Sequence, residues 1–254
     1  MDVLPLLTEK IGTTVIKTST NSISFVPKLH YTISEGNGKA HFPLLLNSLV
    51  SGGFRMLLTR YTAENALREA QVTNPGPWAD HSRYVAQACE NIAKRCPHLD
   101  NDDAYIYGIL HDIGRYAGVT SEKHLIDGYR YCLERGWEKA AQICISHAFM
   151  VKDISSSIGV FDMPQDDKDF MEQFVKDSVY DDYDLLVQLC DALALPSGFC
   201  LLEKRFVDVA IRYGTHPATI ERWKAVLEIK SHFEKIMGCS IYDLLPGVIE
   251  NSFR

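Results

Sequence analysis

The stretch Ile109-Leu110-His111-Asp112-Ile113-Gly114 places two polar residues inside an apolar helical run. Together with Ile106, its apolar residues recur every three or four positions, which predicts one buried helix face. We expect this helix to be capped by Asp102 or a neighbour and to end at Gly114. Because an unpaired carboxylate costs several kcal/mol in a protein interior, Asp112 needs a positive partner there.

Further polar residues lie on other apolar helical faces. His81 begins a stripe that continues through Val85, Ala88, Cys89 and Ile92, His147 ends the run 143–146, and Asp191 lies within the apolar stretch 185–193. A shared divalent cation would supply the missing positive charge. Imidazole nitrogen and carboxylate oxygen together suit iron, manganese, zinc, cobalt or nickel.

Each of these residues also has a purely structural explanation. A single buried histidine is more often a hydrogen-bonded core or capping residue than a ligand, and this is the better interpretation of His124 or His147 alone. Asp191 alone would fit a helix cap or a partner of Arg205. Four separate helices nevertheless each carry a histidine or an aspartate on an apolar face, and this combination favours a metal site.

The chain changes character near Tyr61. Residues 1–60 are rich in Thr, Ser and Gly and contain short β-leaning runs at 13–16 and 22–26, with turns at 35–38 and 51–53. These features indicate a small hairpin or a weakly ordered extension. From Thr62 onward the apolar spacing is helical. The sequence therefore predicts an all-α domain over residues 61–254 and a separate N-terminal extension over residues 1–60, whose role stays unassigned.

Caps and breaks divide the all-α region into helices. The break at 74–77 places Pro77 in the first turn of the helix that carries His81. The remaining helices are expected at Thr62–Ala70 with Thr62 as the cap, Glu122–Arg135, Glu138–His147, Asp167–Leu195 with room for a break, Leu201–Tyr213, and Pro217–Met237 closed by Gly238. The polar loop 152–165 is expected to border a pocket.

Composition narrows the class of partner. The net charge of -7 argues against a protein that mainly grips nucleic-acid phosphates, and no nucleic-acid-binding surface is evident. The seven cysteines include no Cys-x-x-Cys pair, which favours buried reduced thiols. No apolar stretch approaches the length of a membrane span, and the N-terminus lacks the pattern of a secretion signal. These features predict a cytoplasmic protein with no membrane partner.

The stretches 78–82 and 110–115 resemble the HD-domain superfamily of metal-dependent phosphohydrolases, and the resemblance covers about residues 62–213. The residues that stand in the family's order are His81, then His111-Asp112, then Asp191. The stretch 111–114 with His124, Gly128 and His147 is also similar to the HDIG-type branch, which has two additional histidines and a paired-metal site.

The resemblance implies an HD-type helical bundle that binds one or two divalent transition-metal ions. The first ion would be held by His81, His111, Asp112 and Asp191. Asp112 would bridge to a second ion held by His124 and His147. Adjacent residues on a helix point in directions about 100° apart, so His111 and Asp112 would approach the metal centre from two sides.

The resemblance also implies hydrolysis of a phosphate ester or anhydride, of a nucleotide or another small molecule, by a metal-activated water. Asp112 is expected to hold the metal separation and to steer the water. Arg115 would clamp a phosphate or else be solvated at a helix end. Asp80 would orient a ligand histidine or start a helix at the surface, while Arg205 and Lys152 are weaker candidates for phosphate binding.

Two departures from known branches narrow the substrate. Arg115-Tyr116 stands where hydrolases of guanosine alarmones carry Glu-Asp, and 128–130 reads Gly-Tyr-Arg where cyclic di-guanylate phosphodiesterases carry Gly-Tyr-Pro. Neither activity is supported, whereas similarity to dinucleoside polyphosphate hydrolases keeps nucleotides as a substrate class. The alternatives are a non-catalytic metal- or nucleotide-binding sensor module of the same fold and, ranked last, a di-iron oxygenase.

Overall fold

Helices make up most of residues 56–253, which the computed structural model describes together with the short strands β1 (Gly12–Thr14) and β2 (Val26–Lys28). The chain divides into a unit over Met1–Val50 and a unit over Ser51–Arg254. In the first unit the two strands pair antiparallel, with Gly12 opposite Lys28. They overlap the β-leaning runs only in part, and the rest of those runs and the turns at 35–38 and 51–53 lie outside the described residues.

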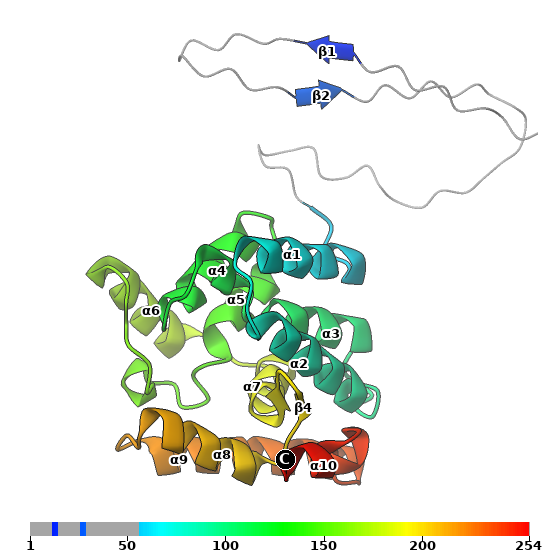
Figure 1. Ribbon diagram of the computed structural model, residues 1–254, viewed down its shortest axis with the longest axis vertical. Helices are drawn as coiled ribbons and strands as arrows, with labels where there is room; N and C mark the ends of the chain where they lie inside the picture. Colours follow the sequence, from blue (N-terminus) through cyan, green and yellow to red (C-terminus); the bar gives the residue numbers. More distant parts are fainter. Residues whose placement is uncertain (1–11, 15–25, 29–55, 254) are drawn as a thin grey trace, which may run out of the picture. The chain divides into compact units, whose positions relative to one another are not determined.

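The second unit is built almost entirely of helices, which confirms the predicted all-α fold (Figure 1). Its helices are α1 (Arg60–Thr73), α2 (Trp78–Ala93), α3 (Asn101–Leu110), α4 (Lys123–Leu133), α5 (Glu138–Ser146), α6 (Gln165–Asp177), α7 (Asp182–Leu193), α8 (Leu202–Tyr213), α9 (Thr219–Met237) and α10 (Val248–Ser252). Shorter elements join them: the 3₁₀ turns η1 (Ile113–Ala117), η2 (Ile154–Ser156) and η3 (Ile241–Leu244), and a hairpin of β3 (Ala194–Leu195) with β4 (Gly198–Phe199).

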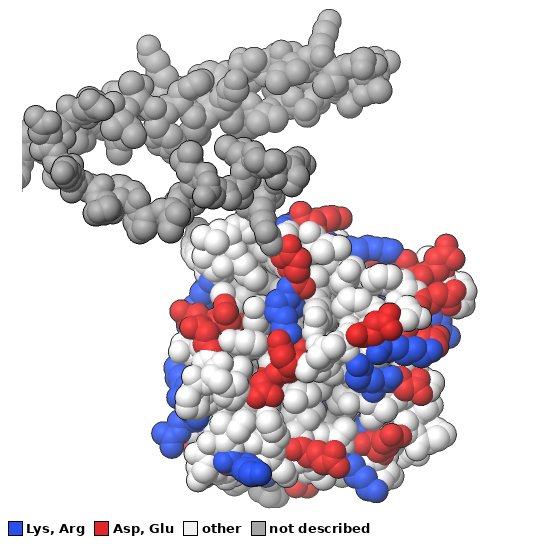
Figure 2. Space-filling model, turned by 180° about the vertical axis from the view of Figure 1, so that it is seen from behind, with Lys and Arg blue, Asp and Glu red and all other residues white. Residues whose placement is uncertain are grey.

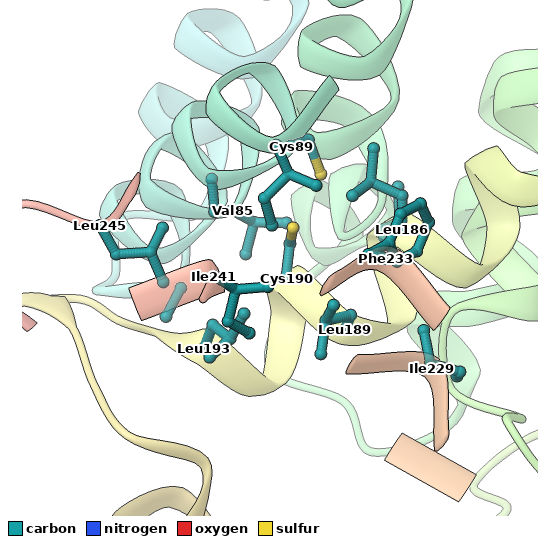
Figure 3. Close-up of a cluster of buried hydrophobic side chains, with 14 of the residues drawn as sticks. Val85, Cys89, Leu186, Leu189, Cys190, Leu193, Ile229, Phe233, Ile241 and Leu245 are labelled. Atoms are coloured by element: carbon teal, nitrogen blue, oxygen red, sulfur yellow. The ribbon is translucent and has the colours of Figure 1, made fainter. Parts of the chain in front are cut away.

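Helix α7 lies between two groups of helices. It packs against α2, α3 and α5 on one side and against α8 and α9 on the other (Figure 1). Val85 and Cys89 of α2, Leu189 of α7 and Phe233 of α9 meet in the core between these groups (Figure 3). A helix contacted from both sides is apolar nearly all round, so a polar side chain on α7 stands out from its neighbours.

Several helix ends differ from the sequence prediction. Thr59, not Thr62, caps α1; Thr62 is the third helical residue and completes a capping box with Thr59. Pro77 precedes α2 rather than lying in its first turn. For α3 the cap is Asp100, within the predicted choice of Asp102 or a neighbour, and it accepts from Asp102 N and Asp103 N. Asp181 caps α7, which divides the predicted helix 167–195 into α6 and α7. Gly238 closes α9 as predicted, in the left-handed conformation with φ 70°.

The helix predicted to run to Gly114 ends earlier, at Leu110. His111 is its C-cap with φ -53° and ψ -39°, whereas Asp112, with φ -104° and ψ 15°, has left the helix and immediately precedes η1. The turn places η1 directly on α4. A Cβ atom at position 114 would lie 1.9 Å from the His124 carbonyl oxygen, so only glycine permits this approach. The expectation that His111 and Asp112 are successive helical residues is therefore wrong.

The surface, the cysteines and the apolar character of the helices each add an observation. Figure 2 shows one face of the unit, on which acidic and basic side chains lie beside one another. All seven cysteines are free thiols, and six of them are buried. No helix in the described residues combines the length and the apolar character needed to cross a bilayer.

Candidate metal centre

Four histidine side chains converge around Asp112, and the five residues come from four segments. Their ligand atoms form two groups in which all atoms lie within 4.8 Å of one another: His81, His111 and Asp112 in one, and Asp112, His124 and His147 in the other. The exposed fractions of the five residues run from 1% for His111 to 8% for His81. Asp112 is common to both groups, so the geometry suits two cations that share one carboxylate.

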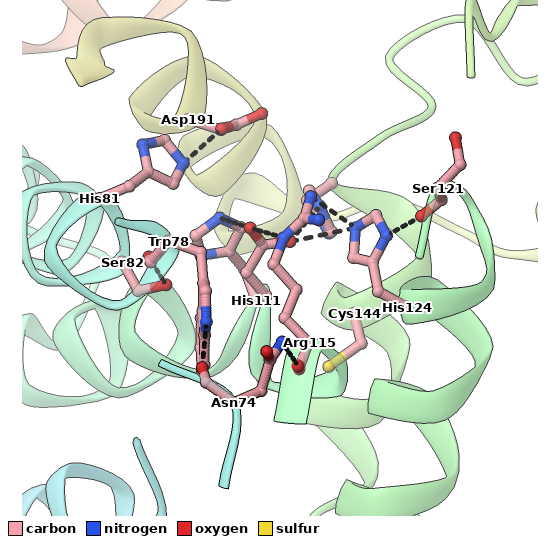
Figure 4. Close-up of polar contacts among 12 residues, drawn as sticks. Asn74, Trp78, His81, Ser82, His111, Arg115, Ser121, His124, Cys144 and Asp191 are labelled. Carbon is pink, nitrogen blue, oxygen red and sulfur yellow. Dashed lines mark hydrogen bonds and ion pairs between the residues drawn. The ribbon is translucent and has the colours of Figure 1, made fainter. Parts of the chain in front are cut away.

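Backbone carbonyls fix the proton position on three of the histidines. The Nδ1 atoms of His111 and His147 lie 2.7 Å and 3.0 Å from the carbonyl oxygens of Gly108 and Ile143. The Nδ1 atom of His124 bonds in the same way to the carbonyl oxygen of Ser121 (Figure 4). A carbonyl oxygen can only accept a hydrogen bond, so each Nδ1 carries the hydrogen, and in the neutral ring each Nε2 presents a bare lone pair.

These three lone pairs face the carboxylate of Asp112. His124 Nε2 lies 3.0 Å from Asp112 Oδ1, His147 Nε2 lies 3.8 Å from the same oxygen, and His111 Nε2 lies 3.9 Å from Asp112 Oδ2. Within the described residues, neither His111 Nε2 nor Asp112 Oδ1 has a hydrogen-bond partner. Buried acceptors that face one another repel unless a positive charge lies between them, which is the donor set of a divalent transition metal.

Protonation of the neutral rings is disfavoured by their surroundings. Burial lowers the pKa of His111 to about 4, against an ordinary value of 6.5, although Asp112 acts in the opposite direction. Burial likewise lowers the pKa of His147. Both rings are therefore neutral near pH 7 and available as ligands.

His81 and Asp191 complete the first group from the side of α7. His81 Nε2 and Asp191 Oδ1 are 2.8 Å apart, and the His81 ring stands edge-on to that of His111 with centroids 5.4 Å apart (Figure 4). Asp191 belongs to neither compact group and joins the centre through His81. Burial opposes ionisation of Asp191, but the hydrogen bond and charge of His81 hold its pKa well below the usual range. Its side chain, 28% exposed, is the most accessible of the six predicted ligands.

Arg115 turns into the centre instead of standing in solvent. Its Nε donates to Asp112 Oδ2 at 2.6 Å, and its Nη2 lies 3.3 Å from His124 Nε2. Asn74 anchors the backbone here, because its side-chain amide donates to the Arg115 carbonyl oxygen at 2.7 Å (Figure 4). Burial acts to raise the pKa of Asp112, but the positive charge of Arg115 is the largest opposing cause, and the pKa lies well below the usual range.

The weaker sequence candidates are placed differently. Asp80 is 56% exposed at its side chain and pairs with Arg83 at 2.7 Å, so it begins a surface helix and orients no ligand. Lys152 binds the carbonyl oxygen of Ser178 and lies over the ring of Tyr180. Arg205 contributes to the low pKa of Asp191 through its charge.

Two groups near the centre were missed at the sequence level. Arg222, one turn into α9, donates to the carbonyl oxygen of Ser156 at 3.2 Å, beside the cleft of about 450 Å³ that the predicted loop 152–165 borders. Burial lowers its pKa, while Glu122 and Asp191 act in the opposite direction. The second group is the buried pair Asp184 and Ser146, joined at 2.5 Å. The sequence alone does not distinguish Arg222 or Ser146 from an arginine or a serine that lies in solvent.

An all-α domain that buries one carboxylate among four imidazoles has side-chain groups that could hold metal ions. Residues 78–195 match the family described as the HD domain. The match confirms the resemblance to the HD superfamily, and its span contains all six predicted ligands. Neither a curated protein nor a solved structure matches the chain.

Proposed function

We propose that this chain is a metal-dependent phosphohydrolase acting on a phosphate ester or anhydride of a nucleotide or another small molecule. The match to the HD family supports metal-dependent hydrolysis in general. The observation that carries the proposal is the convergence of three Nε2 atoms on one buried carboxylate, where His111 Nε2 and Asp112 Oδ1 have no hydrogen-bond partner among the described residues. Arg115 donates to Asp112 Oδ2 and approaches His124 Nε2, but packing does not explain the two buried acceptors that stay without a donor.

In this proposal the two groups hold two divalent cations. His81, His111, Asp112 and Asp191 hold the first, and Asp112, His124 and His147 hold the second, as in the branch of the family with two additional histidines. Divalent cations held there would supply an activated water nucleophile and charge neutralisation at the phosphate. Asp112 fixes their separation by lying in both groups.

Arg115 is the proposed phosphate-binding residue. Its guanidinium holds Asp112 and approaches His124, and an arginine has five N–H donors in a planar fork that matches phosphate oxygens. A substrate phosphate at the centre would compete for these donors with Asp112. The free thiols also suit a reducing compartment, which supports a cytoplasmic location.

A panel assay tests the proposed activity. Phosphate or nucleotide release is measured from nucleoside mono-, di- and triphosphates, dinucleoside polyphosphates and simple phosphate esters, each with Mn²⁺, Co²⁺, Zn²⁺, Ni²⁺ or Fe²⁺. We expect metal-stimulated release that Asp112→Ala abolishes and that the exposed control Asp80→Ala leaves intact. Tight binding of a nucleotide without turnover of any ester would favour a sensor module instead.

A further inference from the structure

Helix α7 carries a stripe of polar residues through the apolar core. Asp184, Gln188 and Asp191 are spaced four and three residues apart, so they lie along one face of the helix. The first two have an exposed fraction of 0%, and the third contacts His81. A buried carboxylate and a buried amide cost free energy unless their contacts compensate, so the stripe needs an explanation beyond packing.

Both fully buried residues of the stripe bind Ser146, the last residue of α5. Ser146 Oγ donates to Asp184 Oδ1 at 2.5 Å, and Gln188 Nε2 donates to the Ser146 carbonyl oxygen at 2.9 Å. Asp184 is held in turn by Lys139 Nζ at 2.6 Å and by the Gln142 amide at 2.9 Å. One α5 residue is thus fixed through its side chain and its backbone.

The two ends of the stripe reach the two halves of the metal centre. Ser146 immediately precedes His147, whose Nε2 faces Asp112 Oδ1 at 3.8 Å. Asp191, at the other end, holds His81 at 2.8 Å. Because both sets of contacts are made by α7, a histidine proposed for each cation is tied to the same helix.

We propose that Asp184, Gln188 and Ser146 are positioning residues that fix His147 against α7 and thereby set the distance between the two cation sites. This inference rests on the proposed function, because the spacing matters only where two cations bind. Residues around metal ligands commonly change affinity by about 10- to 100-fold when they are altered. Loss of the Ser146 contacts is expected to weaken the site of His124 and His147 and to spare the other.

Gln188 separates positioning from folding stability. Its Oε1 has no hydrogen-bond partner among the described residues, and the Ser146 carbonyl oxygen also accepts from Phe149 N at 3.0 Å. Gln188→Met therefore removes a buried unpaired oxygen and leaves the carbonyl bonded. Because no buried acceptor is left without a donor, we expect the replacement to cost little folding free energy. If Gln188 served folding stability alone, Gln188→Met would lower the melting temperature and leave the metal affinity unchanged.

Titration of the metal-free protein with Co²⁺ tests the inference, with visible absorption and calorimetry as the readouts. The variants are Gln188→Met and Ser146→Ala. The matched control is Ser252→Ala in α10, a buried serine whose Oγ donates to Val248 O at 2.6 Å and accepts from Leu201 N at 2.8 Å. We expect both variants to bind the second Co²⁺ about 10- to 100-fold more weakly, with the first unchanged. The control should match the wild type, and the melting temperature of Gln188→Met should not fall.

Equal second-site affinity in the wild type and Gln188→Met would overturn the inference and leave the two-cation proposal standing. A similar loss in Ser252→Ala would also overturn it, because the effect would then be general loosening. A wild type that binds fewer than two Co²⁺ ions would overturn both the inference and the two-cation site.

Discussion

Replacement of Gly114 by alanine tests how the fold holds the metal centre. In the native chain η1 lies directly on α4, and an added Cβ would meet the His124 carbonyl oxygen at 1.9 Å and Gly128 N at 2.4 Å. Contacts of a Cβ atom essentially never fall below 3.0 Å, so Gly114→Ala must move η1 and α4 apart by about 1 Å. Both obstacles are backbone atoms, which no change of rotamer can move.

The displacement acts on the second cation site. Asp112 precedes η1 and His124 lies on α4, with 3.0 Å between Asp112 Oδ1 and His124 Nε2. Metal–ligand distances tolerate changes of only about 0.2 Å, so a shift near 1 Å removes His124 from the site. We expect second-site Co²⁺ affinity to fall about 100-fold and the free energy of unfolding to fall by about 1–3 kcal/mol. Co²⁺ titration and urea denaturation measure the two quantities.

Two other glycines provide controls. Gly238→Ala places a side chain at φ 70°, at the end of α9, and should lower stability by about 1 kcal/mol without affecting the metal sites. In Gly128→Ala the added Cβ would lie 3.0 Å from the Cys144 sulfur and 3.1 Å from both Cys144 Cβ and Gly114 N, so the neighbours need to move by only a few tenths of an ångström and the effect should be milder. The reasoning is refuted if Gly114→Ala binds both cations with wild-type affinity.

Three further outcomes are expected. Burial lowers the pKa of His111 from 6.5 to about 4 in the folded protein. Between these two pH values the histidine is protonated in the unfolded chain and neutral in the folded chain. The stability of the metal-free protein should therefore fall by about 3 kcal/mol as the pH drops from about 6.5 to about 4; a flat profile in chemical denaturation would contradict this. Arg115→Ala should slow phosphate release about 100-fold, on the scale of one lost charge-stabilising donor, with metal content retained; unchanged kcat/KM would remove Arg115 from the site. Saturation with Mn²⁺ at about 100 times its Kd should stabilise the fold by about 2.7 kcal/mol for each site, and an unshifted melting temperature would show that the folded state binds no Mn²⁺.

The sequence predicted the helices well because their apolar stripes are regular. The stripes of α2 and α3 locate His81 and His111 on buried faces, and acids and imidazoles among apolar residues indicate a cation from the sequence alone. The ends of helices were less predictable. Thr59 and Thr62 are both good caps, and only the three-dimensional arrangement shows which one accepts the first hydrogen bond.

The turn at Asp112 could not be predicted from periodicity. Ile113 keeps the apolar spacing of α3, so the pattern extends through a residue pair at which the backbone has already left the helix. The cause is a tertiary contact, the approach of Gly114 to α4, which local spacing does not record. The contacts of Arg222 and of the Ser146–Asp184 pair could not be predicted for the same reason, because the partners lie far apart in the sequence.

The number of divalent ions per chain, measured by elemental analysis after incubation of the apo protein with excess metal and removal of unbound ions, tests the central claim most directly. The converging lone pairs around residue 112 predict two ions in the wild type, fewer than one in Asp112→Asn, and two in the surface control Asp80→Asn. A folded wild type that retains no Fe²⁺, Mn²⁺, Zn²⁺, Co²⁺ or Ni²⁺, or an Asp112→Asn variant that retains as many ions as the wild type, would contradict it.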